Sequence, residues 1–254
     1  MTGRDMRRPL LAALAAASIT SAPAALLAEG NHIAFELGGG LSYGPTYEGS
    51  DDYTSSPSFQ GSLHSFGAGS MSVGGGDATG FGFAPSFGFI GKRDSSEHTA
   101  LKGMDDVDWT LEVGVKAKYT WEFAEVSAAV RKGFNGHEGV VADLAADAIL
   151  RPDAYTTLRL GPRVSLANEE YAETYFSVPA SARNLSAYSA EGGVKSVGAE
   201  FSARRELSDT WSMEGKLAYD RLMNDFADSP VTRSGSEHQV TVGVSLIRQF
   251  DLRF

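Results

Sequence analysis

The sequence has 254 residues, of which 42% are hydrophobic and 21% charged, and it contains 29 glycines and no cysteine. The lack of cysteine excludes disulfides, thiolate metal sites and a lipidated N-terminal cysteine. The formal net charge of −10 excludes the basic surface that nucleic-acid binding requires. Beyond the N-terminus no apolar stretch approaches the ~18 residues of a transmembrane helix, so a helical membrane protein is excluded as well.

The N-terminus has the three-part pattern of a secretory signal peptide. Three arginines precede an apolar run over 10–19, and small residues follow as far as Ala28. The apolar run is too short to span a bilayer. We therefore expect residues 1–28 to be a signal peptide that is cleaved after Ala28, with Ala24 as the alternative position. Residues 29–254 are expected to form one domain.

Alternation of apolar and polar residues dominates the remaining chain. Its clearest example runs from Trp109 to Phe123, where every second residue is apolar and the residues between are polar or small. Aromatic residues stand at both ends of this segment and aliphatic residues between them, which is typical of a lipid-facing band between two interfacial girdles. The segments 31–43 and 79–91 repeat the pattern. A soluble β-sandwich also alternates, but the long strands and their aromatic ends favour a transmembrane barrel.

The last predicted strand, 238–254, ends on an aromatic residue. Phe250, Leu252 and Phe254 continue its apolar face to the final residue. A terminal aromatic residue that closes an alternating strand resembles the signal by which the barrel-assembly machinery recognises its substrates. Together with the signal peptide, this pattern predicts an outer-membrane protein that is surrounded by outer-membrane lipid and lipopolysaccharide.

Counting such segments predicts an all-β fold, a transmembrane antiparallel up-and-down barrel of ten strands. An even number places both chain ends on the periplasmic side, with short turns there and longer loops outside. Splitting the second strand at Gly67–Gly69 and adding a strand within 170–178 gives twelve strands as the alternative. The ten predicted strands are 31–43, 56–73, 79–91, 107–120, 122–131, 139–150, 155–166, 193–206, 211–222 and 238–254.

The polar faces of these strands predict a narrow interior that is filled by side chains or carries a thin water column. No catalytic dyad stands out, because His64 and Ser65 are adjacent in one strand and their side chains point to opposite faces. We therefore expect no enzyme activity, no catalytic residue, no cofactor and no metal site. The charged residues expected inside the barrel include Glu112, Lys116, Lys118, Arg159, Arg163 and Lys195.

Two predicted loops have distinctive compositions. The loop after the first strand combines Pro and Gly with three carboxylates, either as a cation or partner site or as a structured, solvated loop; its spacing is not that of an EF-hand. The segment 171–176 puts three aromatic residues into another loop, where they contact a partner or plug the barrel mouth. The candidate interaction residues are Tyr43, Pro45, Tyr47, Gly49, Ser50, Asp51, Tyr53, Tyr171, Tyr175, Phe176, Ser229 and Pro230.

Taken in order, these segments resemble the MipA/OmpV family of outer-membrane barrels along nearly the whole mature chain. The segment 40–53 is similar to the family's Gly-x-x-Tyr-x-Pro-x-Tyr-x-Gly-Ser-x-Asp pattern, shifted by one residue at the proline. Leu166 stands where tryptophan is usual in the family, and Asn168 where aspartate is usual. Further segments that resemble family motifs are 93–94, 101–108, 136–139, 161–176 and 228–231.

The resemblance implies a scaffolding or interaction role and no catalysis. The name-giving member is described as bringing a murein-cleaving lytic transglycosylase together with a murein synthase. Other members are described as surface antigens, adhesin-like proteins or envelope-stress proteins. The leading hypothesis is therefore a scaffold for murein-remodelling enzymes. The alternatives are a narrow channel or small-solute transporter, suggested by the polar inner face, and a surface adhesin or antigen, suggested by the acidic loops.

Overall fold

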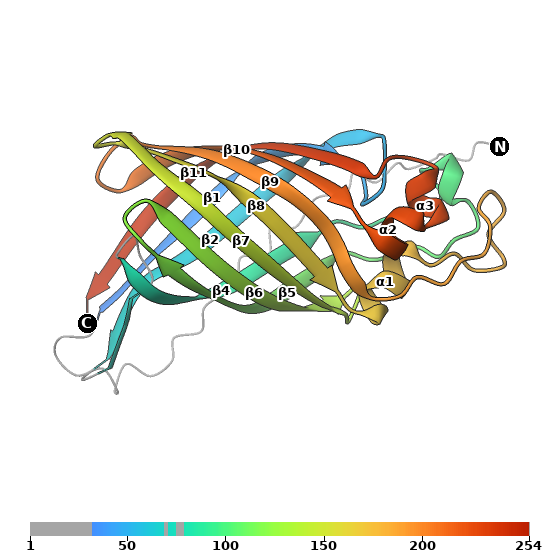
Figure 1. The fold of residues 1–254 in the computed structure, drawn as a ribbon, viewed down its shortest axis with the longest axis horizontal. Helices are drawn as coiled ribbons and strands as arrows, with labels where there is room; N and C mark the ends of the chain where they lie inside the picture. Colours follow the sequence, from blue (N-terminus) through green and yellow to red (C-terminus); the bar gives the residue numbers. More distant parts are fainter. Residues whose placement is uncertain (1–31, 69–70, 75–78, 254) are drawn as a thin grey trace, which may run out of the picture.

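The computed structural model describes residues 32–68, 71–74 and 79–253, which form an antiparallel β-sheet curled into a barrel (Figure 1). The expected signal peptide, 1–28, and the last residue, Phe254, lie outside the described residues. The strands are β1 (His32–Pro45), β2 (Tyr53–Ala68), β3 (Met71–Gly74), β4 (Gly80–Ile90), β5 (Thr110–Thr120), β6 (Ala124–Asn135), β7 (Val140–Asp153), β8 (Thr156–Ala167), β9 (Gly193–Glu206), β10 (Trp211–Leu222) and β11 (His238–Arg253).

The strands follow one another around the sheet, and the first strand pairs with the last. The order across the sheet is β3-β2-β1-β11-β10-β9-β8-β7-β6-β5-β4. In the β1–β11 pair, His32 lies opposite Arg253 and Tyr43 opposite Val242, so the pairing covers almost the whole of β1. This is the strand order of an up-and-down barrel.

The two ends of the sheet meet where β2 and β3 lie beside β4. Among the described strands, no hydrogen-bonded ladder joins β2 to β4. Each of these two strands contains a proline, Pro57 in β2 and Pro85 in β4. Proline has no backbone N–H, so both strands have one hydrogen-bond donor fewer than an ordinary strand of their length.

The ten predicted strands are present in order, and the sheet contains one additional short strand, β3. The segment 56–73 was expected as one strand, but β2 ends at Ala68 and the chain turns back, so that β3 pairs antiparallel with β2. This break falls at the glycine-rich point where the twelve-strand alternative divides the strand. The other part of that alternative is wrong, because the segment 170–178 contains a helix, α1 (Glu169–Phe176), in place of a strand.

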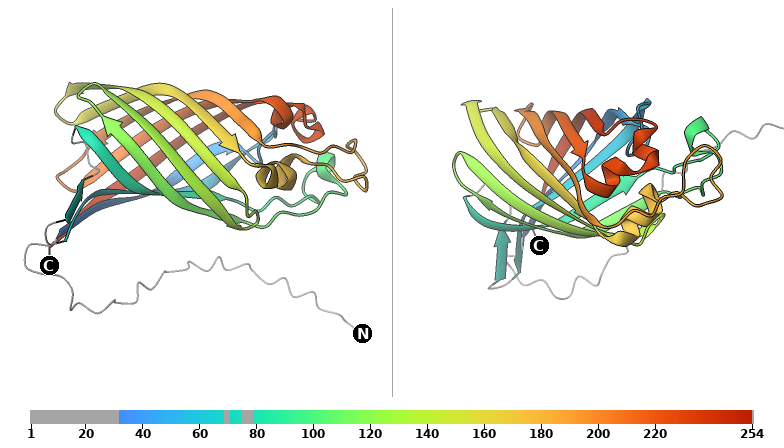
Figure 2. Two further views of the ribbon diagram at one scale, coloured as in Figure 1. Left: turned by 60° about the horizontal axis from the view of Figure 1, so that its bottom comes forward. Right: turned by 45° about the vertical axis from the view of Figure 1, so that its right-hand side comes forward.

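The connections between strands differ in length at the two ends of the barrel (Figure 2). The end that we call the turn end has short turns, at 121–123, 154–155 and 207–210. The opposite end, the loop end, carries the connections 46–52, 91–109, 136–139, 168–192 and 223–237. The described helices all lie at the loop end: η2 (Thr99–Leu101), α1, α2 (Asn224–Asp228) and α3 (Pro230–Arg233). None of these helices is long and apolar enough to cross a membrane.

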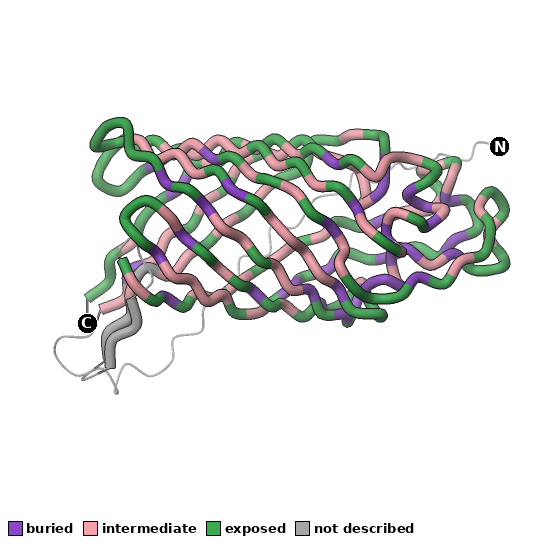
Figure 3. The backbone as a smooth tube through the Cα atoms, viewed as in Figure 1, coloured by how far each residue is buried: buried purple, intermediate pink, exposed green. Residues whose placement is uncertain are grey.

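The outer face of the barrel is apolar, and burial alternates along much of β1, β4 and β11 (Figure 3). Phe59, Phe81 and Val115 leave 81%, 74% and 68% of their surfaces exposed, as residues that face lipid do. Aromatic residues gather near both ends of the wall, as the sequence predicts. The turn-end girdle contains Phe81, Tyr119, Trp121, Phe123, Tyr155, Trp211 and Phe250, and the loop-end girdle contains Tyr43, Tyr53, Phe89, Trp109, Phe134 and Tyr219.

The inner face is charged, and most of its charges are paired. Glu125 of β6 accepts a hydrogen bond from Thr120 at 2.8 Å and lies 3.4 Å from both Lys118 and Arg159. Arg163 of β8 lies 2.8 Å from an oxygen of Asp147. Because an isolated charge in a confined space is costly, such pairing allows the barrel interior to hold many ionised groups.

Candidate functional site

The five loop-end connections fold together into a cap over that end of the barrel (Figures 1 and 2). The central helix of the cap, α1, begins at Glu169 because the Asn168 side chain accepts a hydrogen bond from the backbone N–H of Tyr171. Glu169 and Glu170 in the first turn complement the positive end of the helix dipole. One face of the helix is buried and consists of Tyr171, Ala172, Tyr175 and Phe176.

Two apolar clusters hold the cap together. In the larger one, Phe176 of α1 and Phe226 of α2 are fully buried and pack edge to face, with ring centroids 5.0 Å apart. In the smaller one, Leu101 of the 91–109 connection and Val231 of α3 are also fully buried. Full burial of such side chains contributes about 1.5–3 kcal/mol each. The cap therefore has an apolar interior, whereas the described inner face of the barrel is mainly polar or charged.

A partly buried ion pair joins the cap to the barrel beneath α1. Lys195 Nζ of β9 donates to Glu48 Oε1 at 2.6 Å, and the Tyr171 hydroxyl donates to Glu48 Oε2 at 2.7 Å. The Lys195 ammonium also lies 4.9 Å from the centre of the Tyr171 ring. Burial and the adjacent Glu48 carboxylate raise the pKa of Tyr171 well above its ordinary value. Glu48 thus connects the first loop, α1 and β9.

A histidine lies between α1 and the charged barrel interior. The His137 side chain is fully buried and packs edge-on against Tyr171, with ring centroids 4.8 Å apart. His137 Nε2 lies 3.3 Å from Glu112 Oε1, and Glu112 accepts a second hydrogen bond from Arg131 Nε at 2.8 Å. Gly133 of β6 makes room for the imidazole, because a Cβ atom there would lie 2.2 Å from the ring. The cap and the interior charges are therefore in direct contact.

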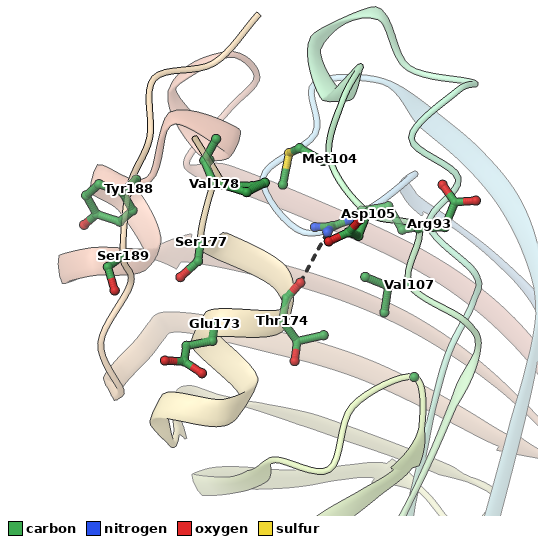
Figure 4. A pocket seen from close by; sticks show the side chains of 13 residues that line it. Arg93, Met104, Asp105, Val107, Glu173, Thr174, Ser177, Val178, Tyr188 and Ser189 are labelled. Carbon is green, nitrogen blue, oxygen red and sulfur yellow. Dashed lines mark hydrogen bonds between the residues drawn. The ribbon is translucent and has the colours of Figure 1, made fainter. Parts of the chain in front are cut away.

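An arginine holds the C-terminal end of α1. The Arg93 guanidinium donates to the carbonyl oxygen of Tyr175 at 2.6 Å and to that of Thr174 at 3.2 Å; Figure 4 shows the second of these bonds. These carbonyls carry the partial negative charge of the helix end, so a cation there is favourable. Arg93 is only 5% exposed, and its burial lowers the pKa of the guanidinium. The backbone of Arg93 is fixed in turn by a bridge to Val107.

A cavity of about 440 Å³ lies beside Arg93, between α1 and the 91–109 connection (Figure 4). Its floor is formed by buried apolar residues, and its rim by exposed carboxylates. Its volume falls in the range of small-molecule sites, roughly 300–1,000 Å³. The floor residues are Met104, Val107 and Val178, and the rim residues include Asp105, Asp106 and Glu173.

The loop after β1 is fixed to the 223–237 connection. Gly49 has a φ of +91°, which favours glycine, and its carbonyl accepts a hydrogen bond from Ser236 N at 2.9 Å. Ser50 is fully buried, and its hydroxyl lies 2.8 Å from that of Thr46. Across the residues that the structure describes, no three His, Cys, Asp or Glu side chains gather as a metal site requires. Of the three carboxylates of this loop, Glu48 points at Lys195.

The cap brings together most of the predicted interaction residues. Ser229 caps the first turn of α3, in which Pro230 follows it, and the Ser229 hydroxyl donates to the Phe176 carbonyl at 2.5 Å. Tyr47 packs against His98, with ring centroids 4.9 Å apart. The other predicted residues that lie within the cap are Gly49, Ser50, Tyr171 and Tyr175.

The remaining predicted residues lie outside the cap interior. Tyr43 and Tyr53 are neighbours in the loop-end girdle, with ring centroids 5.5 Å apart. Pro45 ends β1, and Asp51 is exposed. Of the predicted assembly signal, Phe250 stacks on Phe35 near the turn end and Leu252 is exposed on the same strand.

Sequence patterning alone does not identify three residues that organise the cap: Arg93, His137 and Phe226. Arg93 and His137 each stand in a segment that resembles a family motif, but a single charged or aromatic residue in a loop has no periodicity to indicate burial. Phe226 lies in a helix of five residues, which is too short for a helical pattern. Their partners are distant in the chain, so only the folded structure reveals them.

Comparison with known proteins identifies the chain's relatives. The family described as MltA-interacting protein MipA matches residues 37–250. No curated protein matches the chain. Among solved structures, an outer membrane channel from Pseudomonas putida F1 is similar at 11% identity and a TM-score of 0.44, over 91% of this chain and 100% of that chain. OmpT, an outer membrane protein of Vibrio cholerae, is similar at 8% identity and a TM-score of 0.35, over 86% of this chain and 97% of that chain.

Proposed function

Because this chain belongs to the MltA-interacting protein MipA family, we propose that it is an outer-membrane scaffold for murein-remodelling enzymes. Its partners in this proposal are a periplasmic lytic transglycosylase, a murein hydrolase, and a murein synthase. The supporting observation is the cap, whose packed clusters and partly buried Glu48–Lys195 pair cover the loop end. Because the described loop-end connections cover that end of the barrel, binding of partners at its surfaces is the role that the arrangement supports best.

The turn end is the docking face in this proposal, because the predicted orientation places it in the periplasm. Its turns are short, and beyond the girdle residues Phe123 and Tyr155 they carry one further exposed apolar side chain, Leu207, which is 56% exposed. Exposed aromatic and aliphatic side chains beside charged ones are typical of protein-binding surfaces. Glu122 and Asp209 supply exposed carboxylates in two of these turns.

The proposed role is a binding role without catalysis. His137 contacts Glu112 and tyrosine rings, and His238 Nδ1 lies 2.7 Å from the Tyr219 hydroxyl. Within the described part of the chain, neither imidazole is hydrogen-bonded to a serine or threonine hydroxyl, as the base of a nucleophilic dyad would be.

Affinity capture from detergent-solubilised envelopes tests the scaffold proposal. The tagged protein should retain a murein hydrolase, identified by mass spectrometry and by its activity on murein. Reversing the turn-end charges with Glu122→Lys and Asp209→Lys should reduce this retention. The matched control reverses two charges at the cavity rim of the cap, Asp105→Lys and Glu173→Lys, and should leave retention unchanged.

Two other results of the affinity capture would contradict this proposal. Absence of every murein enzyme from the captured material would overturn the scaffold proposal. Retention of a murein enzyme that depends on the cap charges and not on the turn-end charges would place the cap in the periplasm and would contradict the predicted orientation of the barrel.

A narrow channel is the second candidate, and the charged inner face favours it. Arg159 and Arg163 keep 23% of their side-chain surfaces exposed inside the barrel, so solvent reaches them. Planar-bilayer recordings of the purified protein test this role. Conductance steps that grow when residues 169–190 are deleted would support a channel closed by its cap, and a silent barrel with and without the cap would exclude it.

We also propose that the chain is exported through a cleaved signal peptide and assembled through its C-terminal strand. Sequencing of the mature N-terminus should find Glu29 as the first residue. Replacement of Phe254 by serine should lower the amount of protein in the outer membrane, and unchanged assembly would contradict the proposed signal.

A further inference from the structure

In the part of the barrel that the structure describes, the outer face carries cations but no carboxylates between the strand ends. Within the described strands, every Asp and Glu side chain faces inward or lies among the last three residues of its strand. Two outward arginines have partners at the strand ends: Arg205 lies 2.9 Å from Asp153, and Arg221 lies 3.1 Å from Glu237. The outward cations are Lys132, Arg205, Arg221 and Arg248.

Arg248 differs from the two paired arginines. It is exposed on β11, opposite Leu37 of β1 and Trp211 of β10. Its guanidinium carbon lies 5.4 Å from the centre of the Trp211 ring and 5.1 Å from that of the Phe250 ring. No carboxylate of the described chain lies within salt-bridge distance of this guanidinium. The cation is therefore held in place by two aromatic faces while its N–H donors stay free.

The position of Arg248 in the barrel wall determines which groups its N–H donors contact. The residue lies in the turn-end girdle, and aromatic girdles mark the level of the lipid headgroups. The stacked rings use the faces of the guanidinium and leave its edge, with its fork of N–H groups, available. A planar fork matches two oxygens of a phosphate group. If only water contacted the Arg248 guanidinium, its positive charge would have no anionic partner beside the apolar outer face of the barrel.

We propose that Arg248, Trp211 and Phe250 form a binding site for the phosphate of an anionic phospholipid in the turn-end leaflet. The guanidinium binds the phosphate oxygens, and the two rings keep it at headgroup depth. The indole N–H of Trp211 is an additional donor at the same level. Phe35 extends the apolar surface beneath the site, because it stacks on Phe250 with ring centroids 5.0 Å apart.

Anionic phospholipid is favoured over zwitterionic phospholipid by charge. In a zwitterionic headgroup the lipid's own cation competes for the phosphate, whereas an anionic headgroup leaves the phosphate to the arginine. The surrounding outward positions contribute no negative charge that would repel such a lipid. Arg205 is already paired with Asp153, so it should attract a lipid phosphate less strongly than Arg248 does.

Native mass spectrometry of the purified, folded protein with phosphatidylglycerol tests the site, with phosphatidylcholine as the reference lipid. Arg248→Gln should weaken phosphatidylglycerol retention about fivefold, since one basic residue at an anionic surface contributes about 1 kcal/mol. Lys132→Gln is the matched control: Lys132 is exposed and outward-facing on β6, and no carboxylate or aromatic ring of the described residues pairs with it. Its loss should leave phosphatidylglycerol retention unchanged.

A second variant covers the case in which Arg248→Gln fails to fold. Trp211→Leu keeps the cation and removes one of its rings, so it should weaken phosphatidylglycerol retention by less than the arginine change but more than Lys132→Gln. Equal losses from Arg248→Gln and Lys132→Gln would overturn the proposal, because surface charge alone would then explain binding. Unchanged phosphatidylglycerol retention in both Arg248→Gln and Trp211→Leu would also overturn the proposal. So would a loss of phosphatidylcholine retention as large as the loss of phosphatidylglycerol retention.

A role of Arg248 in barrel assembly is a separate outcome of the same variants. If Arg248→Gln lowers the amount of barrel in the outer membrane but leaves phosphatidylglycerol retention unchanged, the residue serves recognition by the assembly machinery and the lipid site is wrong.

Discussion

The loop end and the turn end of this barrel connect the strands in different ways. Both must connect strands whose apolar side chains face lipid. The turn end does so with turns as short as 154–155, and the loop end with connections as long as 168–192. At the loop end the apolar residues point inward, as Phe176 and Phe226 do, whereas in the wall they point outward. The cap is therefore organised like a small water-soluble domain built on a membrane wall.

The wall and the cap are therefore stabilised by different interactions. Backbone hydrogen bonds between strands hold the wall, and they persist when a lipid-facing side chain changes. Side-chain packing and a few buried polar contacts hold the cap. Substitutions in the cap should therefore loosen the cap and leave the wall intact, and four measurements test this separation.

The largest effect is expected from Phe176→Ala. The side chain is fully buried against Phe226, and removal of a buried phenylalanine costs about 3–5 kcal/mol. Hydrogen exchange should show faster exchange in 168–192 and 223–237 and unchanged exchange in the strands. The control is Phe87→Ala, whose side chain is 59% exposed on the wall and should change cap exchange little. Equal loss of protection in strands and cap would break the separation.

Arg93→Met should have the next largest effect. It removes the hydrogen bonds to the carbonyls of Tyr175 and Thr174, of which the shorter one, to Tyr175, contributes about 1.5–3 kcal/mol as a bond to a charged group and the longer one, at 3.2 Å, contributes little. Limited proteolysis should then cut the C-terminal end of α1 faster. Arg183→Met, at an exposed arginine of the same cap, should leave the cleavage rate unchanged. An equal rise in the cleavage rate of both variants would mean that the overall charge of the cap, and not the contact of Arg93 with the helix carbonyls, protects α1.

Alkaline pH should weaken the cap through Tyr171. The pKa of Tyr171 is raised in the folded cap, so the cap's stability is fully present below the ordinary tyrosine pKa of about 10. As the pH rises beyond that value, the unfolded form ionises while the folded form does not, and stability is lost. Absorbance of tyrosinate, measured with cap proteolysis, should show ionisation and opening together. In Glu48→Gln, which removes the adjacent negative charge, the residue should ionise at lower pH.

The smallest effect is expected from Ser229→Ala. It removes the side-chain cap of α3 and the hydrogen bond to the Phe176 carbonyl, which together contribute about 1–2 kcal/mol. Proteolysis of 223–237 should rise modestly. As a turn-end counterpart, Asp209→Ala should change the free energy of unfolding by less than about 0.5 kcal/mol, as surface substitutions usually do. A larger effect at Asp209 would mean that the turn end is more tightly organised than its short turns indicate.

The sequence was a good guide to the wall because alternation is a local property. Trp109 to Phe123 predicts the strand β5 and its exposed aromatic ends without knowledge of any partner strand. The cap could be predicted only in part. Tyr171 and Phe176 stand out as an aromatic cluster in a loop, but the helix that carries them depends on the Asn168 cap and on packing against Phe226, which is distant in sequence. Local patterns do not report such contacts.

The strand order has a consequence for how quickly the barrel can form. Each ladder in the sheet joins strands that follow one another in the chain, except the one between β1 and β11. Consecutive hairpins need only short loops to close, whereas the pairing of His32 with Arg253 must bring together the two most distant parts of the described chain. That closure is expected to be the slow kinetic step, and substitutions in β11 should delay it more than equal changes in β6.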